Sequence, residues 1–94
     1  LQQCLQTAVR FVPALAGARL TRTWAGLRPH TPDGLPVLGP VPELPGLLMA
    51  TGHEGLGITL APISGALVRA AATGEAPPLN PDPYLQQRFT VAHA

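Results

Sequence analysis

The sequence predicts an α/β fold, a mixed α+β fragment in which a helix, a strand–turn–strand, a buried strand, a glycine loop and a second helix follow in order. Three observations lead to this prediction. Apolar residues recur at helical spacing in two segments, and a short apolar run stands directly before a glycine cluster. The 12 prolines and 10 glycines occupy 22 of 94 positions. This frequency rules out a long coiled coil or a simple helical bundle, because both residue types interrupt regular structure.

The first dozen residues have the pattern of an amphipathic helix, which Pro13 and Gly17 are expected to end. Its apolar face is formed by Leu1, Leu5, Ala8, Val9 and Val12. We expect Cys4 on this apolar side, as a core residue. Residues 20–28 contain threonine and tryptophan and favour a strand.

Thr31-Pro-Asp-Gly34 has the composition of a tight turn, since proline presets φ and Asp-Gly accepts a positive φ. A short partner strand is expected around residues 36–38. The apolar run from Gly46 to Thr51 suits a fully buried strand of a parallel sheet.

The last helix is expected to follow the glycine cluster, with Thr59 as its N-cap and Pro62 in its first turn. Gly74 is well placed to end it. The tail over residues 76–83 contains four prolines and should be extended. Residues 84–94 are weakly specified.

Composition excludes several classes of protein. Hydrophobic residues make up 46% of the chain and charged residues 12%, with a formal net charge of +1, which excludes a disordered acidic or basic tail. Typical domains carry about 25% charged residues. We therefore expect a partner to cover part of the surface, either the rest of a longer protein or another copy in a homo-oligomer. A start at Leu1 rather than methionine also favours a part of something longer.

Other partners and compartments are poorly supported. The arginines are scattered, which argues against nucleic-acid binding, and no apolar run approaches the roughly 20 residues of a membrane span. Cys4 is the single cysteine, so it cannot form an internal disulfide, and no Cys/His spacing suits zinc. A reducing compartment, the cytoplasm, is the expected location.

The most informative feature is the strand, glycine-rich turn and helix over residues 46–73. Such a turn directs backbone N–H groups and the positive end of the helix dipole at one point, which suits an anionic or electron-rich oxygen. The alternative is a tight structural connection without a ligand. Neither a Gly-Lys-Ser/Thr phosphate loop nor a complete dinucleotide fingerprint is present here.

A second candidate site lies on the predicted strand, where alternation points Trp24 and Arg28 to the same face. An indole wall beside a guanidinium would bind a small molecule with a carboxylate. The alternative is an ion pair between Arg28 and Asp33 across the turn. His53 either steadies the glycine loop or contacts a ligand. No set of serine, histidine and acid supports a hydrolase, and no catalytic residue is assigned.

Two segments of the sequence together resemble a known family. They are Trp24-Ala-Gly-Leu-Arg-Pro-His-Thr-Pro-Asp-Gly-Leu-Pro-Val-Leu-Gly39 and Ala50-Thr-Gly-His-Glu-Gly-Leu-Gly-Ile-Thr59. Their order and spacing resemble the C-terminal part of the FAD-dependent D-amino acid oxidase superfamily, whose members include glycine oxidase, sarcosine oxidase and D-amino acid dehydrogenase. The loop looks more like that of dehydrogenase-type members such as hydroxyproline dehydrogenase and hydrogen cyanide synthase subunits.

The resemblance implies an oxidoreductase that converts the C–N bond of a D-amino acid, glycine or a secondary amine to an imine, with FAD as cofactor. It also implies a partial two-layer FAD-binding fold. Arg28 would hold the substrate carboxylate. The flavin would be lined by the loop residues Gly52, His53, Glu54, Gly55, Leu56, Gly57, Ile58 and Thr59. Glycine oxidase has a second arginine where this chain has Gly55, so a two-arginine clamp is not expected.

The same resemblance divides the chain into a substrate-layer part (residues 1–45), a flavin-layer part (46–75) and a tail (76–94). Family members also have an N-terminal Gly-x-Gly-x-x-Gly unit, which this sequence lacks. That unit would lie upstream or on a separate subunit, and the chain alone is expected neither to bind FAD nor to turn over substrate. The competing hypothesis is a non-catalytic, self-associating structural or interaction module.

Overall fold

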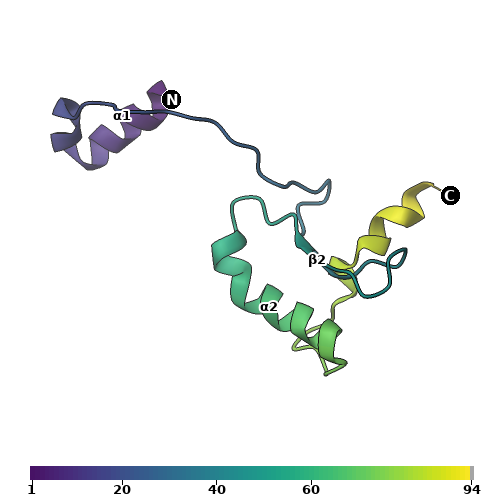
Figure 1. The fold of residues 1–94 in the computed structure, drawn as a ribbon. Coiled ribbons are helices and arrows are strands. Elements are labelled where there is room, and N and C mark those ends of the chain that lie inside the picture. Colours follow the sequence, from purple (N-terminus) through teal and green to yellow (C-terminus); the bar gives the residue numbers. More distant parts are fainter. Residues whose placement is uncertain (94) are drawn as a thin grey trace.

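The computed structural model describes residues 1–93, a small mixed helix and strand fragment (Figure 1). The described elements are α1 (Gln2–Phe11), the 3-10 helix η1 (Pro13–Gly17), β1 (Val37–Pro40), β2 (Leu48–Thr51), α2 (Gly57–Thr73) and the 3-10 helices η2 (Asp82–Tyr84) and η3 (Gln86–His93). This confirms the mixed helix and strand composition. Apart from the three 3-10 helices, which were not predicted, the order of elements differs from the predicted one in the absence of the strand at residues 20–28.

The molecule is elongated, with extents of 55 × 31 × 20 Å and a radius of gyration of 19.1 Å. A compact domain of this length has a radius of gyration of about 12 Å. Figure 1 shows the reason: α1 and η1 lie at one end, and an extended segment joins them to the rest of the chain. We call residues 1–27 the N-terminal arm.

The predicted first helix is confirmed, because α1 ends at Phe11 and Pro13 begins the following 3-10 helix. The prediction that Cys4 lies in a core is wrong: the cysteine is exposed, and no residue of α1 is buried. Among the described residues, the apolar face of α1 lies against η1 and the residues just after it. The helix is therefore formed locally but is not packed into a core.

The strand predicted over residues 20–28 is wrong. The backbone there is unpaired, Trp24 is 80% exposed and Leu27 is 103% exposed. Residue preference alone does not make a strand, since its N–H and C=O groups need a neighbouring strand. No described part of the chain supplies that neighbour.

The strands β1 and β2 form a two-stranded antiparallel sheet in which Val37 pairs with Thr51 and Leu38 with Ala50. The partner strand predicted around residues 36–38 is thus confirmed, at residues 37–40. The prediction of a buried, parallel strand before the glycine cluster is wrong in both respects. The connection over residues 41–47 is too short for a parallel crossover, and β2 is only partly covered.

The turn before β1 is confirmed. The backbone N–H of Gly34 donates to the carbonyl of Thr31 at 3.1 Å, and Gly34 has a φ of 73°. The core lies between β1 and α2, and its buried hydrophobic side chains are Val37, Leu38, Val41, Leu67 and Ala70. Of the two strands, β1 rather than β2 carries the buried residues.

Helix α2 begins at Gly57, two residues before the predicted N-cap Thr59, and its N-cap is Leu56. Pro62 consequently lies further inside the helix than expected. The predicted end is confirmed, since Gly74 has a φ of 75° and its N–H donates to the carbonyl of Ala70 at 2.9 Å. Residues 75–81 are irregular, and Ala94 lies outside the described residues.

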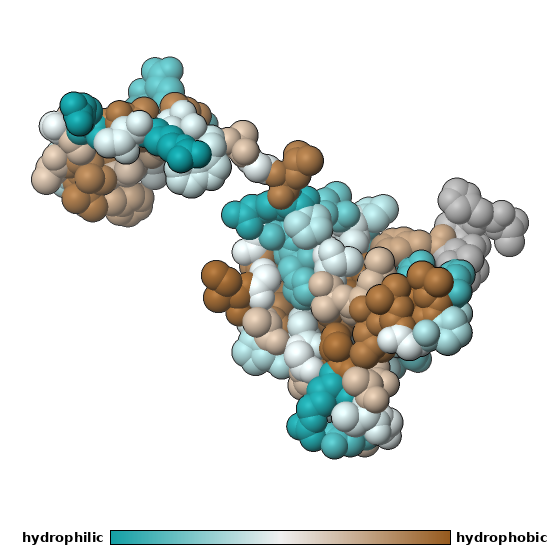
Figure 2. Space-filling view, viewed as in Figure 1, coloured by the Kyte–Doolittle hydropathy of each residue, from teal (hydrophilic) through white to brown (hydrophobic). Residues whose placement is uncertain are grey.

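Large apolar side chains remain at the surface of both the arm and the larger part of the molecule (Figure 2). Among them, Phe11 is 82% exposed and Ile58 is 94% exposed. Within residues 1–93, no helix combines the length and apolar character needed to cross a bilayer.

Candidate flavin and substrate site

The segment just before the turn lies against the glycine loop. Glu54 donates its backbone N–H to the carbonyl of Pro29 at 3.1 Å. In return, the backbone carbonyl of Glu54 accepts a hydrogen bond from Nη1 of Arg28 at 3.2 Å. The two segments singled out from the sequence, which are 26 residues apart at this contact, are therefore held side by side.

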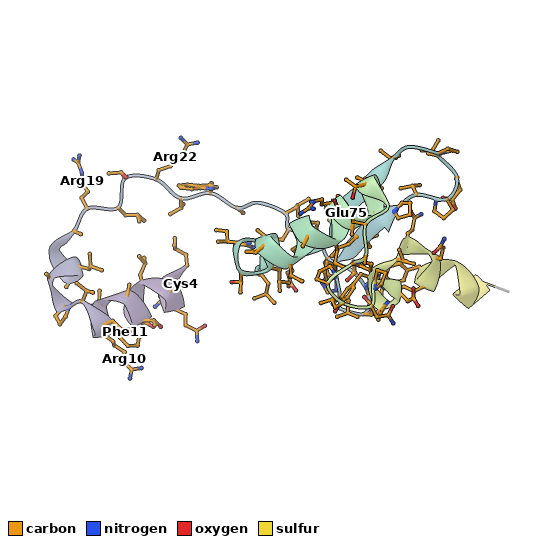
Figure 3. All side chains as sticks on the ribbon, turned by 90° about the horizontal axis from the view of Figure 1, so that it is seen from below. Cys4, Arg10, Phe11, Arg19, Arg22 and Glu75 are labelled. Atoms are coloured by element: carbon orange, nitrogen blue, oxygen red, sulfur yellow. The ribbon has the colours of Figure 1, made fainter. Side chains whose placement is uncertain are left out.

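Arg28 differs from the other arginines in this contact. Arg10, Arg19 and Arg22 lie on the N-terminal arm, at the opposite end from α2 and the sheet (Figure 3). Arg69 pairs with Glu75, and Arg88 pairs with Asp33. Within the described part of the chain, Arg28 is thus the arginine that bonds to the glycine loop.

The alternative role for Arg28, an ion pair with Asp33, is wrong. Asp33 instead accepts from Arg88, with Nε to Oδ2 at 2.6 Å and Nη2 to Oδ1 at 3.2 Å. These hydrogen bonds from Arg88 lower the pKa of the Asp33 carboxyl well below its ordinary value. Arg28 is consequently not engaged by an acidic side chain of the turn.

The backbone of the glycine loop departs from ordinary conformations. Gly52 has a φ of 80°, and Glu54, which is not a glycine, has a φ of 51°. A left-handed conformation at a residue with a side chain costs roughly 1–2 kcal/mol. Such residues persist where neighbouring contacts hold them, and here Glu54 is held by the bond that its N–H donates to Pro29 and the bond that its carbonyl accepts from Arg28. Leu56 closes the loop by donating its N–H to the carbonyl of His53 at 2.9 Å.

The N-terminus of α2 has no side-chain cap. Its N-cap residue is Leu56, which carries no polar side-chain atom, and Thr59 does not cap the helix either. Leu60 donates to the carbonyl of Leu56 at 2.9 Å, whereas the N–H groups of residues 57–59 have no partner among the described residues. Backbone donors of this kind attract negative or electron-rich atoms.

Sequence reasoning missed one bond at this site. Nε2 of His53 lies 2.8 Å from Oγ of Ser64, which is buried on the face of α2 that meets the sheet. The interpretation that His53 steadies the loop agrees with this contact. A serine on the buried face of the helix that follows the loop was the available signal, although the spacing of 11 residues indicates no contact by itself.

Not all predicted site residues come together. Arg28 meets the glycine loop at Glu54, but Trp24 lies on the arm, where its ring centroid is 5.7 Å from the guanidinium carbon of Arg22. Leu56 and Ile58 face outward. Within residues 1–93, no group of three or more histidine, cysteine or acidic side chains is arranged to hold a metal ion.

Comparison with known proteins identifies the family to which the chain belongs. The protein-family model described as "DAO: FAD dependent oxidoreductase" matches residues 1–71. The chain belongs to this FAD-dependent oxidoreductase family, as its resemblance had implied. The competing hypothesis of a non-catalytic interaction module is not favoured by this match.

Individual relatives agree with the family. The chain is 48% identical over 88 residues to the hydrogen cyanide synthase subunit HcnC of Pseudomonas protegens, covering 94% of this chain and 21% of that protein. It is 43% identical over 84 residues to a glycine oxidase of Pseudomonas putida, covering 89% of this chain and 23% of that protein.

A solved structure extends the likeness to three dimensions. The L-amino acid deaminase from Proteus vulgaris matches with a TM-score of 0.75 at 32% identity, over 94% of this chain and 20% of that one. The chain therefore spans about a fifth of the length of the curated relatives and the solved structure that it matches.

Proposed function

We propose that the chain is the C-terminal portion of an FAD-dependent oxidoreductase that oxidises the C–N bond of a D-amino acid, glycine or a secondary amine to an imine. One observation carries this proposal: Arg28 Nη1 donates to the carbonyl of Glu54 at 3.2 Å and thereby joins a guanidinium to the glycine loop. The family match supports the use of FAD in the complete enzyme.

In this proposal Arg28 binds the substrate carboxylate. A guanidinium has five N–H donors, and the bond to Glu54 uses one of them, so a fork of donors remains for a planar carboxylate. The hydrogen bond to the carbonyl of Glu54 would orient the remaining N–H groups of the guanidinium. Trp24 would form a wall of the same pocket, which requires the arm to fold back toward the loop in the complete enzyme.

The glycine loop would line the flavin. Residues 52–59 fit an aromatic ring with an electron-rich edge, because Gly55 has no atom within 4 Å of the place of a Cβ and the N–H groups of residues 57–59 have no cap. FAD, when bound, would accept the two electrons that leave the substrate as its C–N bond becomes an imine. The loop N–H groups would favour negative charge at their site.

The proposal assigns residues 1–45 to the substrate layer, residues 46–75 to the flavin layer and residues 76–94 to a tail. The remaining part of the enzyme, upstream in the same protein or on a separate subunit, would bind the dinucleotide half of FAD. We place the enzyme in the cytoplasm, because the single cysteine of this chain is a free thiol, as is usual in a reducing compartment.

Replacement of Arg28 in the complete enzyme tests this assignment. A charge-assisted hydrogen bond contributes about 1.5–3 kcal/mol, so Arg28→Ala is expected to raise KM for the amino acid roughly 10- to 100-fold. The enzyme should still bind flavin, because Glu54 keeps its hydrogen bond to the carbonyl of Pro29. Arg69→Ala is the matched control, because Arg69 is exposed on α2 and pairs with Glu75 rather than with the loop. Unaltered steady-state kinetics in Arg28→Ala would remove the residue from the substrate site.

A further inference from the structure

The hydrogen bond between His53 and Ser64 has a direction that the surroundings determine. Ser64 is 6% exposed, and its Oγ lies 2.8 Å from Nε2 of His53. Among the described residues, His53 is the sole hydrogen-bond partner of that hydroxyl, since Ser64 makes no bond to the helix backbone. A serine hydroxyl has one hydrogen to donate, and burying it without an acceptor is unfavourable.

The hydroxyl of Ser64 must therefore donate to Nε2, which makes Nε2 the acceptor nitrogen of the neutral ring. The proton of a neutral imidazole then resides on Nδ1, because the bond made by one ring nitrogen sets the protonation of the other. Nδ1 of His53 has no hydrogen-bond partner among the described residues, where the bond of this ring is that of Nε2. The ring thus carries one N–H that the described residues leave unused.

His53 lies close to the start of α2. A Cβ placed on Gly57, the first residue of α2, would be 3.7 Å from Cβ of His53, so the histidine packs against the helix N-terminus. The backbone N–H groups of residues 57–59 belong to this N-terminus and lack a side-chain cap. The uncapped backbone donors at the start of α2 thus lie next to the residue that carries this ring.

We propose that Ser64 is a positioning residue: its buried hydroxyl fixes His53 as the Nδ1–H tautomer and so adds a side-chain donor to the backbone donors at the start of α2. The ligand is a carbonyl or an electron-rich ring nitrogen, which in the complete enzyme would be the acceptor edge of the flavin. That last identification rests on the proposed function. The tautomer itself does not depend on the flavin.

The tautomer can be measured without turnover. The complete enzyme, labelled with 15N-histidine and freed of FAD, is studied by NMR at pH 9, where imidazole side chains are neutral. His53→Asn identifies the resonances of His53. The wild type is expected to show Nδ1–H, and Ser64→Ala is expected to revert toward Nε2–H, which predominates in free histidine. A wild-type ring protonated on Nε2, or Nδ1–H retained in Ser64→Ala, would overturn the proposal.

The flavin-loaded enzyme then tests the consequence. Loss of the oriented donor in Ser64→Ala is expected to weaken FAD binding about two- to tenfold and to lower the midpoint potential of the bound flavin. Ser64→Thr keeps the hydroxyl and should retain both the wild-type tautomer and the potential. If Ser64→Ala changes the tautomer while FAD affinity and potential stay unchanged, the ring donor does not serve the flavin and the proposal fails in that part. The Arg28 kinetics are an independent test, so the two failures are distinguishable.

Discussion

The side-chain methyl group of Thr31 occupies the space into which a side chain at Gly52 would project. A Cβ built on Gly52 would lie 2.6 Å from Cγ2 of Thr31, closer than non-bonded carbons approach. Thr31 is itself buried and donates from Oγ1 to the carbonyl of Leu35 at 2.7 Å, so it has little freedom to move. The turn before β1 and the glycine loop after β2 are therefore fitted together at this one position.

Gly52→Ala is expected to destabilise the complete enzyme and to disturb its glycine loop. The φ of 80° at Gly52 is unfavourable for alanine by roughly 1–2 kcal/mol, and the overlap with Thr31 adds to that. Thermal unfolding should show a lower midpoint, and bound FAD per protein should fall. Gly65→Ala is the matched control, because Gly65 lies on α2 outside the glycine loop, no atom lies within 4 Å of the place of its Cβ, and its φ is not positive. Equal midpoints for the two variants would contradict this account.

The ion pair between Arg88 and Asp33 predicts a loss of stability in acid. The pKa of Asp33 is lowered in the folded chain by its hydrogen bonds to Arg88, whereas an aspartate in an unfolded chain titrates near 3.9. The stabilisation is thus complete above that unfolded value and is lost progressively as the pH falls below about 4. The difference in unfolding midpoint between the wild type and Asp33→Asn should accordingly shrink from pH 6 to pH 3.

Glu43→Gln provides the reference for that pH series. Glu43 is exposed and makes no hydrogen bond or ion pair among the described residues, so its replacement should leave the acid-induced loss in place. If the difference in unfolding midpoint between the wild type and Asp33→Asn stayed constant between pH 6 and pH 3, the pKa of the Asp33 carboxyl would not be lowered in the folded protein.

Much of the fold could be predicted because local signals decide it. The helix at residues 2–11, the turn at Thr31 to Gly34 and the helix end at Gly74 depend on periodicity, proline and positive φ, all of which act over a few residues. The strand expected at residues 20–28 failed because a strand needs a partner, and β propensity does not report whether one is present. The parallel sheet failed because chain connectivity, rather than apolar content, sets strand direction.

The candidate site was foreseeable in its parts but not in its contacts. Residue type singled out Arg28 and the glycine loop, yet the bond between them is to a backbone carbonyl, which carries no signal in the sequence. The pairing of Asp33 with Arg88, 55 residues away, could not be inferred from the sequence. The chain has several arginines, and residue type alone does not show which of them pairs with Asp33. The burial of Ser64 depends on which face of α2 meets the sheet.

The last prediction concerns the 94-residue chain by itself, which is expected not to bind FAD tightly. The loop supplies backbone donors to one edge of a flavin ring, but the described residues offer no second wall, and Ile58 at the start of α2 is 94% exposed. Titration of FAD with the purified chain should leave flavin absorbance and fluorescence unaltered at micromolar concentrations. The exposed apolar residues of the arm should at the same time promote association of copies, visible by sedimentation. Stoichiometric, tight FAD binding by a monomeric chain would show that the remainder of the enzyme is not needed to hold the cofactor, and would contradict the assignment of residues 46–75 as one layer of a larger site.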